Sequence, residues 1–251
     1  MREAGRVMLS AHGVEGDVSV KAGSANFVTV YDVRIQNFII DEIRRVIPGA
    51  VFIAEEKDND PDVLKEEFCF IIDPIDGTTN FIRDYRHSCI SLAMVSKGET
   101  VFGAVYDPYL DEMFSAEKGK GAFLNGKSIY VSDREPDMAI VAYGTSPYYK
   151  ENLAGKTFAI CRDLFMNSAD VRRCGSAALD LAYTAAGRND AFFECMLSPW
   201  DIAAGALLIT EAGGTISDMN GDPVTLTKPV PVIASNERCR EWLLMTVKKH
   251  N

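Results

Sequence analysis

Two aspartates three positions apart directly follow an apolar run in the first third of the chain. Residues 70–78 read FIIDPIDGT, which places Asp73 and Asp76 at the end of a strand-like segment. Pro74 lacks a backbone N–H and fixes φ, so the strand is predicted to stop there, and Gly77 allows close approach of a ligand to the backbone. Two carboxylates at one turn repel each other unless protons or cations lie between them, and hard oxygen ligands suit Mg²⁺. The segment therefore indicates a magnesium site, with backbone amides after the second aspartate available to a phosphate group.

These residues alone leave a purely structural interpretation open. Asp-Pro and Asp-Gly are common in turns, where the aspartate side chain bonds its own backbone. The longer string FIIDPIDGTTNF, residues 70–81, is far more specific. It resembles the central motif of the inositol monophosphatase family, part of a superfamily of lithium-sensitive, metal-dependent phosphatases.

Further segments resemble the same family in the same order, so the resemblance covers nearly the whole chain. They read FVTVYD at 27–32, FIAEE at 52–56, RCGSAALD at 173–180, DAFFE at 190–194, PWDIAAG at 199–205 and TEAGG at 210–214. Taken singly, each has an ordinary explanation. Two glutamates after a strand are often a solvated edge, and Ser176 or Asp201 could serve only the first turn of a helix.

The resemblance implies a role for each matching residue. Two or three Mg²⁺ ions are expected, one held by Glu55, Asp73 and the Ile75 carbonyl and a second by Asp73, Asp76 and Asp201. Such an arrangement suits in-line displacement at phosphorus by a metal-activated water.

The same resemblance implies the catalytic and substrate-binding residues. Glu55 and Thr78, the latter polarised by Asp32, would orient and deprotonate the attacking water, and Asp32 is also predicted to cap a helix. The residues expected to contact the substrate are Asp76, Gly77, Thr78, Gly175, Ser176, Ala177, Glu194 and Asp201.

Two positions depart from the family pattern and leave the substrate open. Arg83 and Ser198 stand where histidine is common, and both are expected to flank the site. The leading function is hydrolysis of inositol 1-phosphate or a related small phosphorylated alcohol, and a fructose-1,6-bisphosphatase of the same superfamily is the alternative enzyme. Members that hydrolyse 3′-phosphoadenosine phosphate usually carry Lys-Glu in place of Thr79-Asn80. A catalytically silent regulator, or a partner of the transcription machinery, is the alternative from another class.

Composition limits the remaining possibilities. A net charge of −10 argues against a nucleic-acid-binding surface, and no apolar run approaches the roughly 20 residues that a membrane helix needs. The 6 cysteines have neither disulfide-framework nor zinc-finger spacing, which favours free thiols in a reducing cytoplasm. We expect a small phosphorylated metabolite as ligand and, from the family and the prevalence of two-fold assemblies, a homodimer.

Hydrophobic periodicity predicts a change of architecture near residue 132. Before it, we expect helices over 2–11, ended by Gly13, and 33–46, capped by Asp32, and a mostly antiparallel sheet with a hairpin turn at Asn125-Gly126. The predicted strands are 51–54, 69–72, 90–95, 100–106, 112–116, 122–124 and 128–131. After it, strands over 140–143, 191–194, 215–217 and 232–234 alternate with helices over 176–186, 202–212 and 237–249.

The resemblance implies the fold into which these elements assemble. It is the layered αβαβα sandwich of the inositol monophosphatase and fructose-1,6-bisphosphatase type. An N-terminal α+β half, residues 1–131, would carry the metal-binding motif, and a C-terminal α/β half, residues 132–251, would complete the site between them. The first half of the family's opening helix has no counterpart in this sequence.

Overall fold

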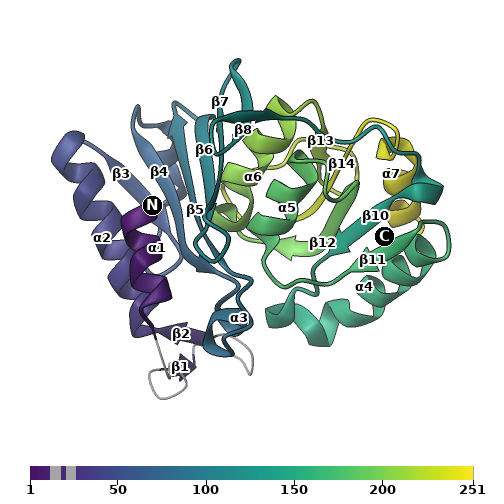
Figure 1. Ribbon diagram of the computed structural model, residues 1–251, viewed down its shortest axis with the longest axis horizontal. Helices are drawn as coiled ribbons and strands as arrows, with labels where there is room; N and C mark the ends of the chain where they lie inside the picture. The colour runs from purple at the N-terminus through teal and green to yellow at the C-terminus, as the bar shows by residue number, and fades with distance from the viewer. Residues whose placement is uncertain (12–17, 21–26, 251) are drawn as a thin grey trace.

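A computed structural model describes residues 1–11, 18–20 and 27–250 of the chain (Figure 1). Its first sheet has seven strands in the order β3-β4-β5-β6-β7-β8-β9, in which β3 and β4 are parallel and all other neighbours are antiparallel. The strands are β3 (Val51–Ala54), β4 (Cys69–Asp76), β5 (Cys89–Ser96), β6 (Glu99–Asp107), β7 (Glu112–Glu117), β8 (Gly121–Leu124) and β9 (Lys127–Ile129). The mostly antiparallel sheet expected from period-two patterning is confirmed.

The second sheet has five strands in the order β11-β10-β12-β14-β13. β10 lies parallel to both β11 and β12, whereas β14 runs antiparallel to its neighbours β12 and β13. The strands are β10 (Ile140–Tyr143), β11 (Asp170–Arg172), β12 (Ala191–Leu197), β13 (Thr215–Ser217) and β14 (Val230–Ser235). A separate pair, β1 (Val18–Val20) and β2 (Phe27–Thr29), is antiparallel.

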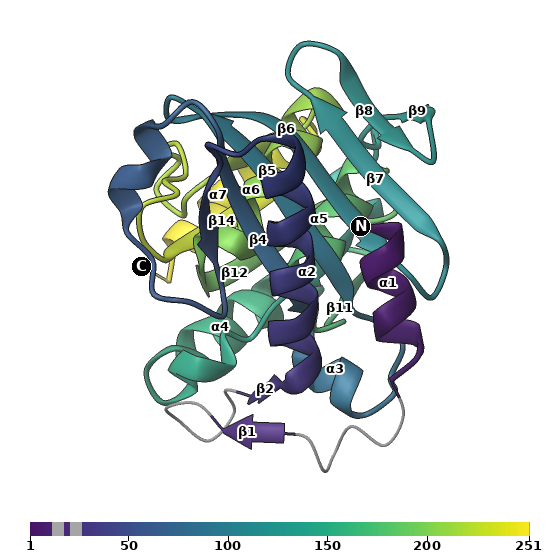
Figure 2. The ribbon, with the colours of Figure 1, turned by 90° about the vertical axis from the view of Figure 1, so that its left-hand side faces the viewer.

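Helices form three layers around the two sheets. α1 (Arg2–Leu9) and α2 (Val30–Val46) cover the outer face of the first sheet, as Figure 2 shows. α5 (Ala177–Ala185) and α6 (Pro199–Glu211) lie between the sheets, and α4 (Lys150–Phe165) and α7 (Arg240–Lys248) cover the far face of the second (Figure 1). The order of layers is therefore αβαβα, as expected. Shorter helices are α3 (Thr78–Ile82) and the 3₁₀ segments Pro61–Lys65, Pro136–Met138 and Pro147–Tyr149.

The central helix layer joins the two halves into one core. Leu179 and Leu208, from α5 and α6, are fully buried in a cluster that also contains Phe114 of the first sheet and Phe192 of the second. Each such side chain contributes about 1.5–3 kcal/mol by leaving water. None of the described helices is long and apolar enough to span a membrane.

Local sequence signals set several of these elements. Asn125 and Gly126 both have positive φ, 48° and 78°, and connect β8 to β9 across the Leu124–Lys127 pair, as predicted for this hairpin. Val7 and Met8 of α1 pack into the hydrophobic cluster between the outer helices and the first sheet. Gly13, the expected end of that helix, lies outside the described residues.

Several expected elements differ from the structure, and three of these differences have a clear physical reason. α2 starts one turn earlier than predicted because Thr29, not Asp32, is its N-cap, and Asp32 occupies the third position of a capping box. β4 continues through Pro74 because the register of β4 and β5 shifts between Asp73 and Asp76, and a bulge tolerates a residue without an N–H.

The third error is the omission of α4 and β11. The inward positions of α4 include Thr157, Ile160 and Leu164 at helical spacing. Phe158 and Phe165 are apolar but exposed, so the apolar residues of this segment do not mark a single face in the sequence. β11 has only three residues, which is too short for a clear strand pattern.

Candidate metal and phosphate site

The carboxyl ends of β3 and β4 bring Glu55 and Asp73 together. Ala54 is paired with Ile72 in the parallel register, and the amide of Glu55 donates to the Ile72 carbonyl at 3.2 Å. Parallel strands end at the same edge of a sheet, so the residues that follow them are neighbours. The two carboxylates are therefore close enough to interact. Burial is the main cause of the raised pKa of Asp73, and the charge of Glu55 is the second cause.

The turn after Asp73 positions Asp76 and Thr78. Asp73 Oδ1 accepts a hydrogen bond from the Ile75 amide at 3.0 Å. Asp73 therefore stabilises the turn that follows it, as the purely structural interpretation of this segment predicts. Gly77 has φ 87° and caps α3, and a Cβ there would lie 3.1 Å from the carbonyl oxygens of His87 and Gly175. Glycine is needed because of both the left-handed backbone and this close approach.

Asp201 reaches the same place from the middle helix layer. It is the third residue of α6, and its Oδ2 accepts the Ser198 amide at 2.7 Å. Its capping role and its place in the site thus coexist. One oxygen from each of Asp73, Asp76 and Asp201 lies within 4.8 Å of the others. We call these three residues and Glu55 the carboxylate centre.

The charges of the carboxylate centre oppose one another. Burial raises the pKa of Asp73 well above its usual range, and the charges of Glu55, Asp76 and Asp201 raise it further. Burial, then the charges of Asp76 and Glu55, has the same effect on the pKa of Asp201. Buried like charges favour protonation or a bound cation. An all-oxygen donor set of this density fits Mg²⁺ rather than a softer metal.

The N-terminus of α5 is directed at Asp76. The Ser176 hydroxyl and the Ala178 amide donate to Asp76 Oδ2 at 2.5 and 2.8 Å. Burial raises the pKa of Asp76, and these two donors partly offset that rise. The positive end of the helix therefore favours the ionised form of this carboxylate. Ser176 is also the N-cap of α5.

Thr78 and Asp32 make hydrogen bonds other than the expected one. Thr78 Oγ1 donates to the Ile75 carbonyl at 3.0 Å, and Asp32 Oδ2 accepts the Thr29 amide and hydroxyl at 2.7 and 2.6 Å. The Asp32 Oδ1 atom has no hydrogen-bond partner among the described residues. Burial raises the pKa of Asp32 to about 6, and the bonds from Thr29 oppose the rise.

A cavity of about 500 Å³ opens over the carboxylate centre. Every residue predicted for metal or substrate binding lines it, whereas Asp32 does not. Those lining residues are Glu55, Asp73, Ile75, Asp76, Gly77, Thr78, Gly175, Ser176, Ala177, Glu194 and Asp201. Ser198 lines it too, but Arg83, the C-cap of α3, lies outside the lining.

Glu194 forms the opposite side of the cavity. Its Oε1 accepts the Ser146 amide at 2.7 Å and the Ser146 hydroxyl at 3.3 Å. A Cβ on Gly144 would lie 1.9 Å from Oε2 of Glu194, so a larger residue at this position would displace the carboxylate. We call Gly144, Ser146 and Glu194 the Glu194 wall. Burial raises the pKa of Glu194 to about 7, and the bonds from Ser146 oppose the rise.

Sequence reasoning missed the loop after β10 and one cation. Arg173 is the single cationic residue that lines the cavity within the described chain, and its guanidinium donates to Thr145 Oγ1 at 3.1 Å. Tyr148 also lines it; burial around its hydroxyl, then the charges of Glu55 and Asp201, raises the pKa of this half-exposed side chain. The available signal was the basic pair Arg172-Arg173 immediately before the glycine-led start of α5.

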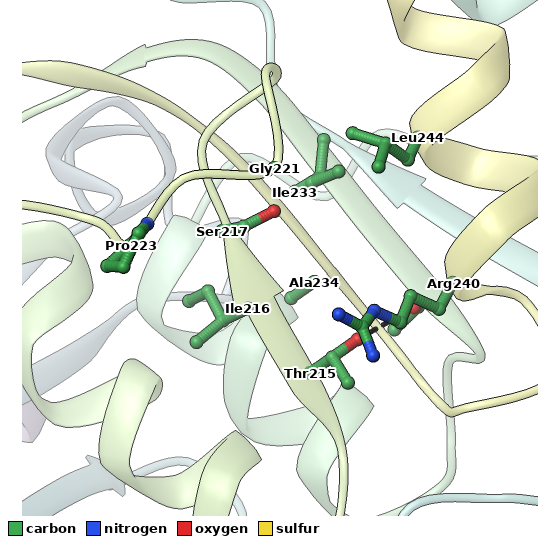
Figure 3. Close-up of a pocket in the computed structure, with 10 residues that line it drawn as sticks. Thr215, Ile216, Ser217, Gly221, Pro223, Ile233, Ala234, Arg240 and Leu244 are labelled. Carbon is green, nitrogen blue, oxygen red and sulfur yellow. Dashed lines mark hydrogen bonds between the residues drawn. The ribbon is translucent and has the colours of Figure 1, made fainter.

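A smaller cavity of about 180 Å³ lies elsewhere, between β13, β14 and α7 (Figure 3). Arg240 and Leu244 line it from α7, and Thr215 and Ser217 from β13. It has no carboxylate in its lining, so it lacks the donor set of the larger cavity.

Comparison with known proteins identifies the family. The whole chain, residues 1–251, matches the model of the inositol monophosphatase family. A relative from Escherichia coli strain K12 named Nus factor SuhB is 43% identical over 222 residues, 88% of this chain and 82% of the relative. An inositol-1-monophosphatase from Mesorhizobium japonicum is 39% identical over 232 residues, 92% of this chain and 86% of the relative. The structure of an IMPase from Thermotoga maritima superposes with a TM-score of 0.90 at 34% identity and covers 100% of this chain and 94% of that one. With a family match over the full sequence and relatives this similar, the chain belongs to the inositol monophosphatase family.

Proposed function

We propose that this chain is a Mg²⁺-dependent phosphomonoesterase that hydrolyses inositol 1-phosphate or a related small phosphorylated alcohol. The observation that carries the proposal is the carboxylate centre, in which Asp73, Asp76 and Asp201 have oxygens within 4.8 Å of one another at one end of a large cavity. The name of the Mesorhizobium japonicum relative, an inositol-1-monophosphatase, supports the choice of substrate class.

Asp73, Asp76, Asp201, Glu55 and the Ile75 carbonyl are the groups that would hold Mg²⁺. The raised pKa values of Asp73 and Asp201 support this, because divalent cations would offset the carboxylate repulsion that adds to the effect of burial. When bound, Mg²⁺ supplies positive charge for a phosphate group and lowers the pKa of a water molecule.

We propose that two residues of the chain orient and deprotonate the attacking water. Glu55, at the end of β3, is the proposed proton acceptor. Thr78 Oγ1, which holds the Ile75 carbonyl at 3.0 Å, is the proposed orienting group. A water that donates to Glu55 and contacts Thr78 would have its attack direction fixed by two separate strand ends.

The remaining lining residues would bind the substrate. Arg173 is the only cationic residue among the described residues that line this cavity, so it is a candidate partner for phosphate oxygens. Glu194, across the cavity, can accept a hydrogen bond from a substrate hydroxyl group. A compact polyol phosphate could contact Arg173 with its phosphate group and Glu194 with a hydroxyl group.

The experiment is a phosphate-release assay over inositol 1-phosphate, fructose 1,6-bisphosphate, sugar monophosphates and nucleotide phosphates. We expect turnover of inositol 1-phosphate or a similar polyol phosphate with Mg²⁺, inhibition by Li⁺ or Ca²⁺, and none in excess chelator. Preference for fructose 1,6-bisphosphate would select the alternative enzyme. Full turnover in excess chelator would remove the metal from the proposal.

A non-catalytic regulatory role is the second candidate. The observation that favours it is the name of the Escherichia coli relative, Nus factor SuhB, at 43% identity. Absence of turnover on the whole substrate panel, by a folded protein that still binds Mg²⁺, would favour this role over the enzyme. A homodimer and a cytoplasmic location stay predictions; the six free thiols are compatible with the latter.

A further inference from the structure

A second group of metal-ligating side chains includes Asp180, which also lines the cavity. His87, Cys174 and Asp180 each offer one atom, a ring nitrogen, a thiol sulfur and a carboxylate oxygen, and these atoms lie within 4.8 Å of one another. His87 precedes β5, Cys174 lies between β11 and α5, and Asp180 is in the first turn of α5. None of the three takes part in the reaction proposed above.

The backbone on two sides of this cluster is held by one side chain. Asn80 Nδ2 donates to the carbonyl of His87 at 2.7 Å and to the carbonyl of Cys174 at 2.9 Å. The His87 ring packs edge-on against Tyr183, one helical turn after Asp180, with centroids 6.0 Å apart. The imidazole and the thiol are therefore positioned relative to each other and to α5, not merely adjacent on a surface.

Two polar atoms of the cluster lack hydrogen-bond partners. Asp180 is only 1% exposed, yet its Oδ1 has no partner among the described residues, and the same holds for Nε2 of His87. A buried carboxylate oxygen normally has a partner, and leaving one unmade costs about 1–3 kcal/mol. The two atoms without hydrogen-bond partners indicate that a ligand binds between them.

The donor set decides what that ligand is. One sulfur, one nitrogen and one oxygen suit a borderline-soft cation, above all Zn²⁺, and do not suit Mg²⁺. The ligand atoms of a tetrahedral zinc site lie about 3.5 Å apart, from bond lengths of about 2.0–2.3 Å, so small side-chain rotations would close the present cluster. We propose that His87, Cys174 and Asp180 form a second metal site, selective for Zn²⁺ or a similar transition-metal ion and separate from the carboxylate centre.

The charges around the cluster agree with this assignment. Burial, then the charge of Asp180, raises the pKa of Cys174 to about 11. Burial, then the charges of Glu194 and Asp76, raises the pKa of Asp180 well above its usual range. A bound cation would stabilise both ionised groups and displace their protons.

The proposed site is coupled by position to the carboxylate centre. Ser176 and Ala178, which donate to Asp76, lie in the sequence between Cys174 and Asp180. A metal held by the two flanking residues would therefore restrain the segment that positions Asp76. The proposal itself does not depend on phosphatase activity.

Co²⁺ titration of the reduced full-length protein in excess Mg²⁺ tests the site directly. Co²⁺ replaces Zn²⁺ in tetrahedral sites, and a cobalt–thiolate bond absorbs in the near ultraviolet, whereas cobalt bound only to carboxylates does not. We expect one saturable thiolate band that stoichiometric Zn²⁺ removes. Absence of the band in the wild type would overturn the proposal.

Matched variants identify the thiol and its companions. Cys174→Ala should abolish the band, whereas Cys161→Ala, on the buried face of α4, should leave it unchanged. His87→Gln and Asp180→Asn should each weaken Co²⁺ binding by at least about tenfold. Two variants are tested so that the result stands even if one of them folds poorly. A band that survives in Cys174→Ala would show that another thiol binds the metal and would overturn the assignment.

Discussion

The two sides of the large cavity balance their charge in different ways. In the carboxylate centre, Asp73 and Asp201 face other carboxylates, and the pKa values of both are raised well above the usual range. In the Glu194 wall, the carboxylate accepts both hydrogen-bonding groups of Ser146, and its pKa rises only to about 7. The first arrangement requires cations for full ionisation, whereas the second is already partly satisfied by protein donors. This difference is the reason for proposing metals on one side of the cavity and substrate hydroxyl groups on the other.

Asp76→Asn should have the largest effect, because it removes a charge and a proposed metal ligand from the crowded side. We expect at least a loss of about a thousandfold in Mg²⁺-dependent turnover. The melting temperature without Mg²⁺ should be unchanged or higher, since one buried like charge is gone while an amide oxygen can still accept from α5. The Mg²⁺-dependent rise in melting temperature should shrink.

Thermal melts with and without Mg²⁺, beside a phosphate-release assay, check both parts of this prediction. Asp84→Asn, an exposed aspartate outside the cavity lining, is the matched control and should resemble the wild type. If Asp76 is only a turn residue, Asp76→Asn will keep its turnover and its Mg²⁺ response.

Glu55→Gln tests whether Glu55, and not the adjacent Glu56, belongs to the carboxylate centre. Glu55 lines the cavity, whereas the backbone of Glu56 is held by the Gln36 side chain and the residue is not in the lining. Glu55→Gln should slow turnover by several orders of magnitude with little loss of stability, because the volume is kept while the proposed base is lost.

Glu56→Gln, as the control, should change turnover little. The measurement is kcat at saturating Mg²⁺ for both variants. The reverse ranking would transfer the role to Glu56.

Ser176→Ala should have an intermediate effect, because it removes one of the two donors to Asp76 and keeps the other. The Mg²⁺ concentration needed for half-maximal activity should rise by about tenfold, as for other residues that orient a metal ligand. The N-cap of α5 is lost as well, which costs about 1 kcal/mol of folding stability. A fall in melting temperature with no change in the Mg²⁺ requirement would show that Ser176 is structural only.

Glu194→Gln should change the pH dependence of folding stability. In chelator, the folded protein holds the Glu194 proton up to a pKa of about 7, whereas an unfolded glutamate releases it near about 4.3. Stability from this group is therefore full below pH about 4 and is lost as pH rises towards about 7, by at most about 1.4 kcal/mol per pH unit.

Glu194→Gln should remove that component of the pH dependence, and exposed Glu237→Gln should retain it. Urea unfolding between pH 4.5 and 8 measures the slope for both variants. A slope unchanged by Glu194→Gln would show that a group outside the Glu194 wall takes up the proton.

Much of the fold and most of the proposed site could be predicted from local patterns. The succession of strands and helices followed from periodicity, and the layered sandwich followed from the resemblance of motifs such as residues 70–81 to the family. The elements that failed were those whose signals conflict. Apolar Phe158 and Phe165 are exposed on α4, and β4 passes through Pro74 because a bulge accommodates it.

Sequence alone determined which side chains were chemically able to hold a metal, since Asp73, Asp76 and Asp201 are distinguished by residue type and by their neighbours. Tertiary structure alone decided what surrounds them. Ser146, His87 and the stretch that contains Arg173, Cys174 and Asp180 come from three segments whose spacing in the chain carries no ligand pattern. Whether such groups meet depends on long-range packing of two sheets around α5 and α6. Burial and the distance to other charges, which set each pKa, arise only when that packing is complete.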